Sequence, residues 1–423
     1  MPADDTSTST PNQAPAAPLS MKQVLLCGAL IVTVSMGIRH GFGLWLQPIT
    51  MERGWTRETF AFAMAVQNLA WGAAGPIAGM LADRWGAFRV LQGGALLYML
   101  GLLTMALAST GLGFTTGAGL LIGIAQSGTT YAVIYGVLGR NVEPSRRSWA
   151  MGVAAAAGSF GQFLMVPVEN LLIAYLGWQQ ALFVLAVFAL AIVPLAIGLK
   201  EPALRLASAA GSPGAGSPVI GVRQAMREAF GDRSFLLIMA GYFVCGFQVV
   251  FIGVHMPSYL KDHGLAPQVA TVALALIGLF NVFGTYGAGV LGQHLAKKHV
   301  LAAIYALRSL VIVVFLASPL TPLSVYVFSA VMGLLWLSTV PPTNALVAQL
   351  FGVRHLSMLG GFVFLSHQVG SFLGVWLGGV LYDRSGSYDV VWWISIALGL
   401  MAAAVNLPVR EPSPRAALAA ARA

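Results

Sequence analysis

Residues 79–91 read GMLADRWGAFRVL, and residues 289–301 read GVLGQHLAKKHVL. The two stretches align without a gap, and each follows a long apolar segment and carries basic residues toward its end. Two pairs of glycines recur at the same shift along the chain, Gly54 with Gly264 and Gly123 with Gly333. Agreement at one spacing in three places predicts an internal repeat, so the chain should consist of two related halves.

The composition is that of a membrane protein. Of the 423 residues, 57% are hydrophobic and only 9% are charged, and the mean hydropathy is +0.79. A membrane-spanning helix needs about 20 mostly apolar residues. The stretches 90–139 and 309–353 contain no Asp, Glu, Lys or Arg, and each is long enough for two such helices.

Apolar windows between turn signals predict twelve transmembrane helices. They fall at 21–48, 59–82, 87–109, 115–139, 149–173, 178–199, 234–258, 266–291, 299–317, 321–347, 358–381 and 390–408. The predicted fold is therefore an all-α membrane protein with two pseudo-symmetric six-helix bundles. We expect these bundles at 21–199 and 234–408, with a disordered tail at 1–20, a linker containing a short amphipathic helix at 200–233, and a second tail at 409–423.

The basic residues predict the orientation. Most Lys and Arg residues lie on one side of the predicted membrane, the exceptions being Arg53, Arg57, Lys261 and Arg384 outside and Arg39 and Arg308 within spans. The positive-inside rule then places both termini and the linker in the cytoplasm, and we expect a multi-pass protein of a bacterial inner membrane. Because this bias explains the net charge of +9, nucleic-acid binding has no remaining support. We expect a monomer in the lipid bilayer.

The segment from Gly79 to Arg89 resembles the loop signature between helices 2 and 3 of the major facilitator superfamily, and this resemblance covers nearly the whole chain from 21 to 408. It implies that Asp83 ends a helix on the cytoplasmic side and contacts the neighbouring helix, and that Arg84 and Arg89 hold the inner side closed while the outer side is open. The implied conformational gate consists of Gly79, Asp83, Arg84, Gly86 and Arg89. A simple polar turn is the alternative.

Within the superfamily the chain resembles the monocarboxylate and oxalate/formate porter branch. Arg146 and Arg147, followed by the small residues of 150–161, are similar to the entry of helix 5 in that branch, and this basic pair is expected to be structural. Phe247-Gln248, His255-Met-Pro257 and 366–374 resemble parts of helices 7 and 11 of bacterial members.

This chain differs from members of that branch at several positions where those members carry charged residues. Members that handle carboxylates carry an Arg in helix 8 where this chain has Thr285, and animal members carry an Asp where it has Asn281. A Lys of oxalate-type members aligns with His367, and a Lys of animal members lies near His40. These departures leave a simple monocarboxylate assignment open.

Charges within a span are costly and usually face a cavity or a partner. Arg39 and His40 precede a Gly41-Phe-Gly43 break in helix 1, and we expect one of them to contact an anionic substrate, with structural pairing to a neighbouring helix as the alternative. For Arg308, in helix 9, a structural role is favoured. The full set of candidate substrate contacts is Arg39, His40, Tyr131, Gln162, Gln248, Asn281, Thr285, His367 and Gln368.

Proton coupling requires a group that changes its charge near the working pH. The candidates are His40, His367 and Glu169, although Glu169, near the outer end of helix 5, could simply be solvated. We expect no cofactor and no metal.

These features predict a secondary transporter that moves a small organic anion by alternating access, coupled to protons. Efflux of a larger apolar or aromatic compound is the alternative. A membrane sensor or enzyme is more distant, since no soluble output domain and no His-Glu-x-x-His, Gly-x-Ser-x-Gly or phosphate-loop motif is found.

Overall fold

The computed structural model describes residues 19–143, 146–201, 222–351 and 356–411. The described residues form helices and no strand. Eleven helical stretches are long and apolar enough to cross a membrane. The long helix outside this set is α3 (Arg57–Trp85), whose span is made less apolar by Gln67 and Asn68. The predicted tails lie almost entirely outside the described residues, as does most of the linker.

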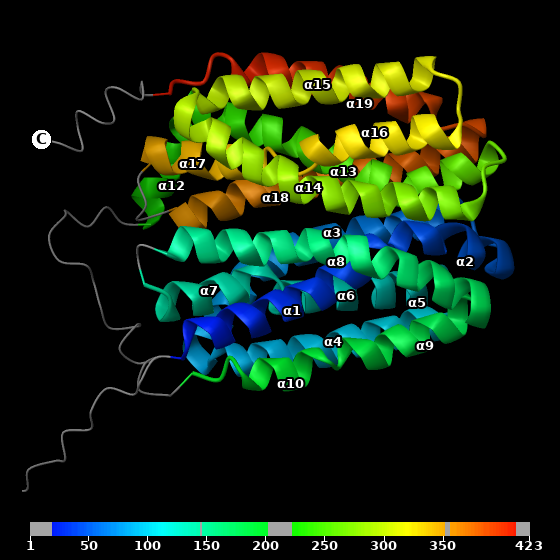
Figure 1. Ribbon diagram of the computed structural model, residues 1–423, viewed down its shortest axis with the longest axis horizontal. Coiled ribbons are helices and arrows are strands. Elements are labelled where there is room, and N and C mark those ends of the chain that lie inside the picture. The colour runs from blue at the N-terminus through cyan, green and yellow to red at the C-terminus, as the bar shows by residue number, and fades with distance from the viewer. Residues whose placement is uncertain (1–18, 144–145, 202–221, 352–355, 412–423) are drawn as a thin grey trace, which may run out of the picture.

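Figure 1 shows two layers of roughly parallel helices, one from each half of the chain. The first half contains α1 (Met21–His40), the 3₁₀ turn η1 (Phe42–Trp45), α2 (Leu46–Arg53), α3, α4 (Ala87–Leu107), α5 (Gly111–Phe114), the π-helical turn η2 (Thr115–Leu121), α6 (Ile122–Thr129), α7 (Tyr131–Asn141), α8 (Arg147–Leu176), α9 (Trp178–Ala189) and α10 (Ile192–Ile197).

The second half begins with the short helix α12 (Val222–Gly231), which has the position and length expected for the amphipathic linker helix. It continues with α13 (Arg233–Asp262), α14 (Pro267–His294), α15 (Lys297–Ala317), α16 (Pro322–Leu335), α17 (Val340–Phe351), α18 (Leu356–Ser385) and α19 (Asp389–Asn406). The two halves meet where α3 packs on α18 and where α8 packs on α14.

The repeat read from the sequence has a physical counterpart in the turns. Gly54 ends α2 with φ of +66°, and Gly264, just after α13, has φ of +80°. Both lie in the left-handed region that favours glycine. Each half therefore leaves its first membrane crossing through the same kind of turn.

The second glycine pair makes equivalent helix contacts. A Cβ on Gly123 would lie 2.6 Å from the Gln67 carbonyl oxygen, and a Cβ on Gly333 would lie 2.9 Å from that of Ile277. In each half the fourth membrane crossing thus packs closely on the second, and Gln67 and Ile277 are separated by the same shift as the glycines. Small residues permit this backbone approach between membrane helices.

Three of the helices predicted as continuous are interrupted. Thr130, in an extended conformation, separates α6 from α7, residues 336–339 separate α16 from α17, and Leu190 and Ala191 separate α9 from α10. An apolar window records hydrophobicity and not hydrogen bonding, so these breaks are invisible to it. The predicted break in helix 1 is present, because α1 ends at His40.

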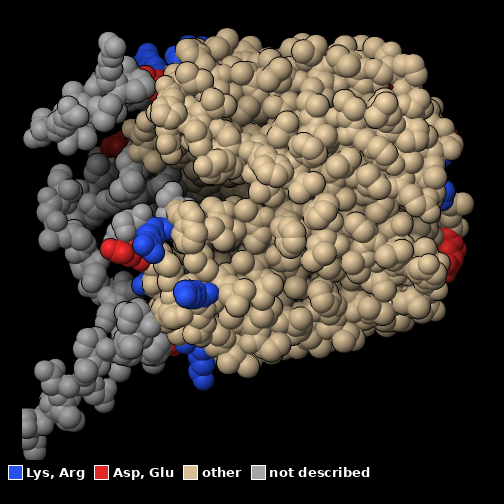
Figure 2. Space-filling view, viewed as in Figure 1, with Lys and Arg blue, Asp and Glu red and all other residues tan. Residues whose placement is uncertain are grey.

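Charged side chains gather at the two ends of the molecule and leave the visible face between them largely without charged residues (Figure 2). We call the end that carries α12 the linker end, and the end that carries Arg57 and Asp262 the opposite end. Figure 2 also shows that the surface is hollowed between the two halves toward the linker end.

Candidate substrate site

The break in helix 1 is seated between the two halves. A Cβ on Gly41 would overlap the carboxyl group of Glu169 in α8, and a Cβ on Gly43 would overlap the carbonyl oxygen of Gly253 in α13. Glycine is therefore required at both positions for the chain to approach its neighbours this closely. The break places Arg39 and His40 beside a central cavity between the halves.

The cavity has a mixed lining. Arg39 and His40 face an apolar wall from α13, made by Val249, Val250 and Val254. The remaining lining residues are Phe42, Gly43, Met64, Gln67, Asn68, Gln162, Gly253 and Trp336. Arg39 is the one cationic residue in this described lining.

Arg39 has polar and aromatic neighbours. Its Nη2 donates a hydrogen bond to Asn68 Oδ1 at 2.5 Å, and its guanidinium carbon lies 4.7 Å from the ring centre of Trp71. Its Nε is buried and has no acceptor among the described residues. The ion pairs of the described residues do not include Arg39. A half-buried cation without a carboxylate partner among the described residues is suited to binding an anion.

His40 lines the same cavity. Its Nδ1 lies 2.6 Å from the Met36 carbonyl oxygen. Because a carbonyl oxygen only accepts hydrogen bonds, Nδ1 carries a hydrogen. In the neutral ring, Nε2 is then left as an acceptor.

Glu169 is fully buried, so the solvated alternative considered for it is wrong. Its Oε2 accepts a hydrogen bond from Trp45 Nε1 at 3.0 Å, and its Oε1 has no donor among the described residues. Trp45 belongs to η1, directly after the helix 1 break. The carboxyl group of Glu169 therefore packs against the segment that follows Arg39 and His40.

Gln162 and Asn281 join the two halves next to the cavity. Gln162 lines the cavity, but its amide nitrogen donates to the Leu274 carbonyl at 2.9 Å. Asn281 donates to Ser159 Oγ at 2.8 Å and accepts from Thr285 Oγ1 at 3.1 Å. Both Asn281 and Thr285 lie outside the cavity lining.

The other candidates are placed away from the cavity lining. Gln248 donates to the Ser395 carbonyl at 2.9 Å and accepts from Arg308, so it faces α15 and α19. Gln368 donates to the Asn68 carbonyl at 3.0 Å and thereby joins α18 to α3. Tyr131 packs on Tyr135 with ring centres 5.5 Å apart.

His367 lies beside Gln368. Its Nδ1 is 3.1 Å from Gln368 Oε1, and its ring packs on Tyr242 with centres 4.9 Å apart. This side chain is 8% exposed and does not line the central cavity. A direct contact with substrate would require it to leave this aromatic setting.

Arg308 makes the contacts expected of a structural residue. It is fully buried, and its Nε and Nη2 donate to the Leu335 carbonyl at 3.1 and 2.7 Å. Its Nη2 also donates to the Trp336 carbonyl. These carbonyls end α16, where a helix leaves acceptors without internal partners.

The loop expected to form the conformational gate lies at the linker end. Gly86 ends α3 with φ of +89°, and Gly79 has open space around its Cα. Arg84 and Arg89 are exposed, as is Arg146. The side chains of Asp83 and Arg147 lie outside the described part of the structure. The gate role of this loop stays a prediction.

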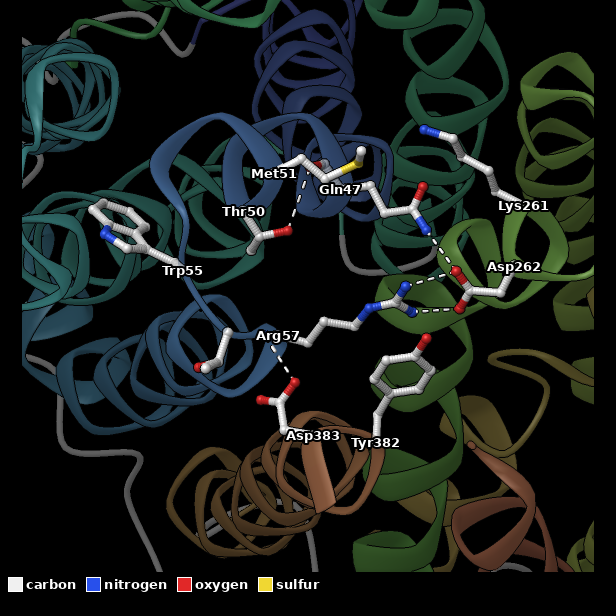
Figure 3. A pocket seen from close by; sticks show the side chains of 10 residues that line it. Gln47, Thr50, Met51, Trp55, Arg57, Lys261, Asp262, Tyr382 and Asp383 are labelled. Carbon is white, nitrogen blue, oxygen red and sulfur yellow. Dashed lines mark hydrogen bonds and ion pairs between the residues drawn. The ribbon is translucent and has the colours of Figure 1, made fainter. Parts of the chain in front are cut away.

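A polar network joins the halves at the opposite end, and its role was missed in the sequence. Figure 3 shows Arg57 extending from α3 between Asp262 and Tyr382. Its Nη1 and Nη2 lie 2.6 and 2.7 Å from the two carboxylate oxygens of Asp262. The guanidinium also lies 3.7 Å from the ring centre of Tyr382 and donates to Tyr388 Oη at 2.9 Å.

The same network caps α3 from the other half. Asp383 in α18 accepts from the backbone N–H groups of Arg57 and Glu58 at 3.1 and 2.7 Å, which are otherwise unpaired donors of the first helical turn. Tyr388 is also 3.1 Å from His255 Nδ1, while His255 Nε2 is 2.7 Å from the Val375 carbonyl. The signal available in the sequence was the presence of opposite charges at helix ends on one side of the membrane.

The comparisons with known proteins agree with this architecture. The family model described as Major Facilitator Superfamily matches residues 25–351 and 288–423. The chain belongs to the Major Facilitator Superfamily. The family and the relatives described below are transporters and not enzymes.

Three curated relatives of this superfamily chain are similar over most of its length. The MFS-type transporter YcxA of Bacillus subtilis (strain 168), itself uncharacterized, is 22% identical, with 92% of this chain and 95% of the relative covered. Monocarboxylate transporter 11 of Homo sapiens is 28% identical, with coverage of 84% and 74%. Monocarboxylate transporter 13 of Bos taurus is 24% identical, with coverage of 87% and 84%.

A solved structure shares the superfamily fold. A bacterial homolog of the human lysosomal transporter Spinster, in an inward-facing and unoccupied conformation, superposes with a TM-score of 0.71. It is 14% identical, with 94% of this chain and all of that chain covered. The predicted fold class and the predicted superfamily are thereby confirmed, and the protein is a multi-pass membrane protein.

Proposed function

We propose that this transporter moves a small organic anion with a carboxylate group by alternating access and couples the movement to protons. The observation that carries the proposal is Arg39, a cation without a carboxylate partner in the described residues, at a cavity between the two halves. An anionic oxygen that replaces the missing partner would gain a charge-assisted hydrogen bond in a site with little water.

The two ends of the molecule support alternating access. At the opposite end Arg57, Asp262 and Asp383 join the halves, whereas the surface is hollowed between the halves at the linker end. This arrangement is a state open toward the linker end. We place the linker end in the cytoplasm of a bacterial inner membrane, because basic residues are concentrated there.

The carboxylate class is supported by the relatives named monocarboxylate transporters. In the cavity, the apolar wall of Val249, Val250 and Val254 suits the hydrocarbon part of such an acid. The same wall would also suit a larger apolar compound, so export of such a compound is the competing outcome of the test below.

Proton coupling is assigned to the helix 1 break. His40 lines the cavity, and Glu169 packs against Gly41 immediately behind it, whereas His367 is held among aromatic rings. Glu169 is buried and has no cationic partner among the described residues. Gain or loss of its proton would therefore change the stability of the neighbouring break in helix 1. Glu169 is therefore the first candidate, followed by His40.

A thermal-shift screen of the purified protein tests the substrate class, because a ligand that binds only the folded state raises the Tm. We expect benzoate or pyruvate to raise the Tm, and benzamide, which matches benzoate in shape but carries no charge, to leave it unchanged. In Arg39→Gln the shift caused by the acids should disappear. If no acid shifts the Tm while benzamide or larger apolar compounds do, the competing export function is favoured.

A further inference from the structure

The central cavity has a second unpaired donor, which comes from the half opposite Arg39. The indole of Trp336 lines the cavity and is 2% exposed, and its Nε1 has no acceptor among the described residues. Of the buried side-chain atoms without a described partner, only Arg39 Nε and Trp336 Nε1 belong to residues of this lining. Both are N–H donors, so a ligand that accepts hydrogen bonds would satisfy both.

A buried N–H without an acceptor costs free energy, and a ligand that accepts from it recovers that cost. A carboxylate is suited to this pair because it only accepts and has two oxygen atoms. Arg39 belongs to the first half and Trp336 to the second, so one carboxylate held by both would join the halves through the substrate itself.

The backbone around Trp336 is satisfied by side chains outside the cavity lining. The carbonyl groups of Leu335 and Trp336 accept from Arg308, and the N–H of Leu337 donates to Asn281 Oδ1 at 2.9 Å. The break between α16 and α17 is therefore fixed from both sides. The carbonyl oxygens that could repel an anion are occupied by a guanidinium.

The position of Arg308 is itself fixed. Gln248 accepts from Arg308 Nη1 at 3.4 Å and donates to the Ser395 carbonyl of α19 at 2.9 Å. Arg308 Nη2 also lies 3.6 Å from Cys245 Sγ in α13. This buried cation thus ties α15 to α13 and to the end of α16, and it has no part in the cavity lining.

We propose that the Trp336 indole N–H is the donor with which the second half binds the carboxylate held by Arg39, and that Arg308 is the positioning residue that fixes Trp336. This inference rests on the proposed function and extends it. Arg39 supplies a positive charge, and the uncharged indole N–H of Trp336 supplies a directional hydrogen bond. A monocarboxylate with an apolar remainder then satisfies both donors, while a second carboxylate would meet the valine wall.

The decisive comparison uses two tryptophans whose indole nitrogens both lack a described acceptor. Trp336→Phe removes the N–H and keeps an aromatic ring at the cavity, whereas Trp392→Phe makes the same change in α19, away from the cavity. With benzoate and pyruvate as probes, we expect Trp336→Phe to raise the Kd about tenfold, as for loss of one hydrogen bond to a charged group. Trp392→Phe should bind like the wild type.

Equal Kd values for Trp336→Phe and the wild type would overturn the inference, as would an equal loss in Trp392→Phe. The failure of the proposed function looks different. In that case the wild type itself binds neither acid, and both proposals fall. If the wild type binds the acids and Arg39→Gln does not, while Trp336→Phe is unchanged, the anion site stands and only the role of Trp336 is lost.

The positioning role of Arg308 is tested by combining variants. Arg308→Gln should raise the Kd about as much as Trp336→Phe. Because both changes remove the same contact, the Kd of the double variant should not exceed the higher of the two single-variant values. Losses that multiply to about a hundredfold would show that the two residues act independently. Arg308→Lys, which keeps a cationic donor for one carbonyl, should restore part of the affinity and provides the readout if Arg308→Gln does not fold.

Discussion

Arg57 of α3 and Asp262 at the end of α13 form a two-point ion pair that joins the two halves at the opposite end. Gln47 adds a hydrogen bond to the same carboxylate at 2.9 Å, so α2 also takes part.

Burial raises the pKa of the Tyr388 hydroxyl, which is a further partner of Arg57. The protonated hydroxyl can accept from Arg57 and donate to His255 Nδ1, because the Val375 carbonyl requires the hydrogen of His255 to be on Nε2. This chain of contacts joins the two halves at the opposite end.

Removing the Arg57 guanidinium should open that end more often. We expect Arg57→Gln to increase the labelling rate of a cysteine at Val254, in a background of Cys27→Ser and Cys245→Ala, when an impermeant thiol reagent is applied from the opposite end. The increase should be about fivefold, since a partly exposed ion pair contributes about 1 kcal/mol. The control is Glu201→Gln, which breaks the pair between Arg140 of α7 and Glu201 at the start of the linker, a pair that does not join the two halves. Equal labelling in Arg57→Gln and the control would argue against this gate.

Close packing at Gly379 should be needed for the same closure. A Cβ at this position would lie 2.7 Å from Ala61 Cβ and 2.8 Å from Glu58 Cα, so α18 meets α3 at the backbone. Gly379→Val should keep the halves apart at the opposite end and reduce transport at least about tenfold, while the protein still folds. Gly361→Val in the same helix, where nothing lies within 4 Å, should transport normally. Matching rates in the two variants would show that this packing does not limit transport.

Glu169 should make transport depend on protons. Glu169→Gln keeps an oxygen that can accept from Trp45 Nε1 but cannot ionise. Uptake of labelled benzoate driven by a pH gradient should fall to the rate without a gradient, while exchange of internal for external benzoate should continue. Trp45→Phe keeps the carboxyl group and should retain the response to the gradient. A full response in Glu169→Gln would move the coupling role to His40.

Much of the fold was predictable because membrane helices follow composition and length. The repeat was also readable, since Gly54 and Gly264 are required by positive φ, and Gly123 and Gly333 by close helix contact. Arg39 was found because a cation in an apolar span is rare. The break after it was signalled by the adjacent glycines.

The remaining parts of the site depend on contacts that sequence does not encode locally. Gln248 was expected at the substrate, yet Arg308 and the Ser395 carbonyl take both ends of its amide. Trp336 lies at a break that a hydrophobic window reads as continuous helix. Arg57, Asp262 and Asp383 resemble ordinary loop charges until the two halves are brought together.

Uptake into proteoliposomes tests directly whether Arg39 holds a carboxylate that is carried between the two sides. Purified protein would be reconstituted, and accumulation of labelled benzoate and pyruvate would be followed with the outside made acidic. The wild type should accumulate at least one of the acids, and Arg39→Gln should reach no more than about a tenth of that rate, as expected for loss of a charged contact. Equal accumulation by Arg39→Gln and the wild type, or no accumulation of either acid by the wild type, would show that Arg39 does not hold a transported carboxylate.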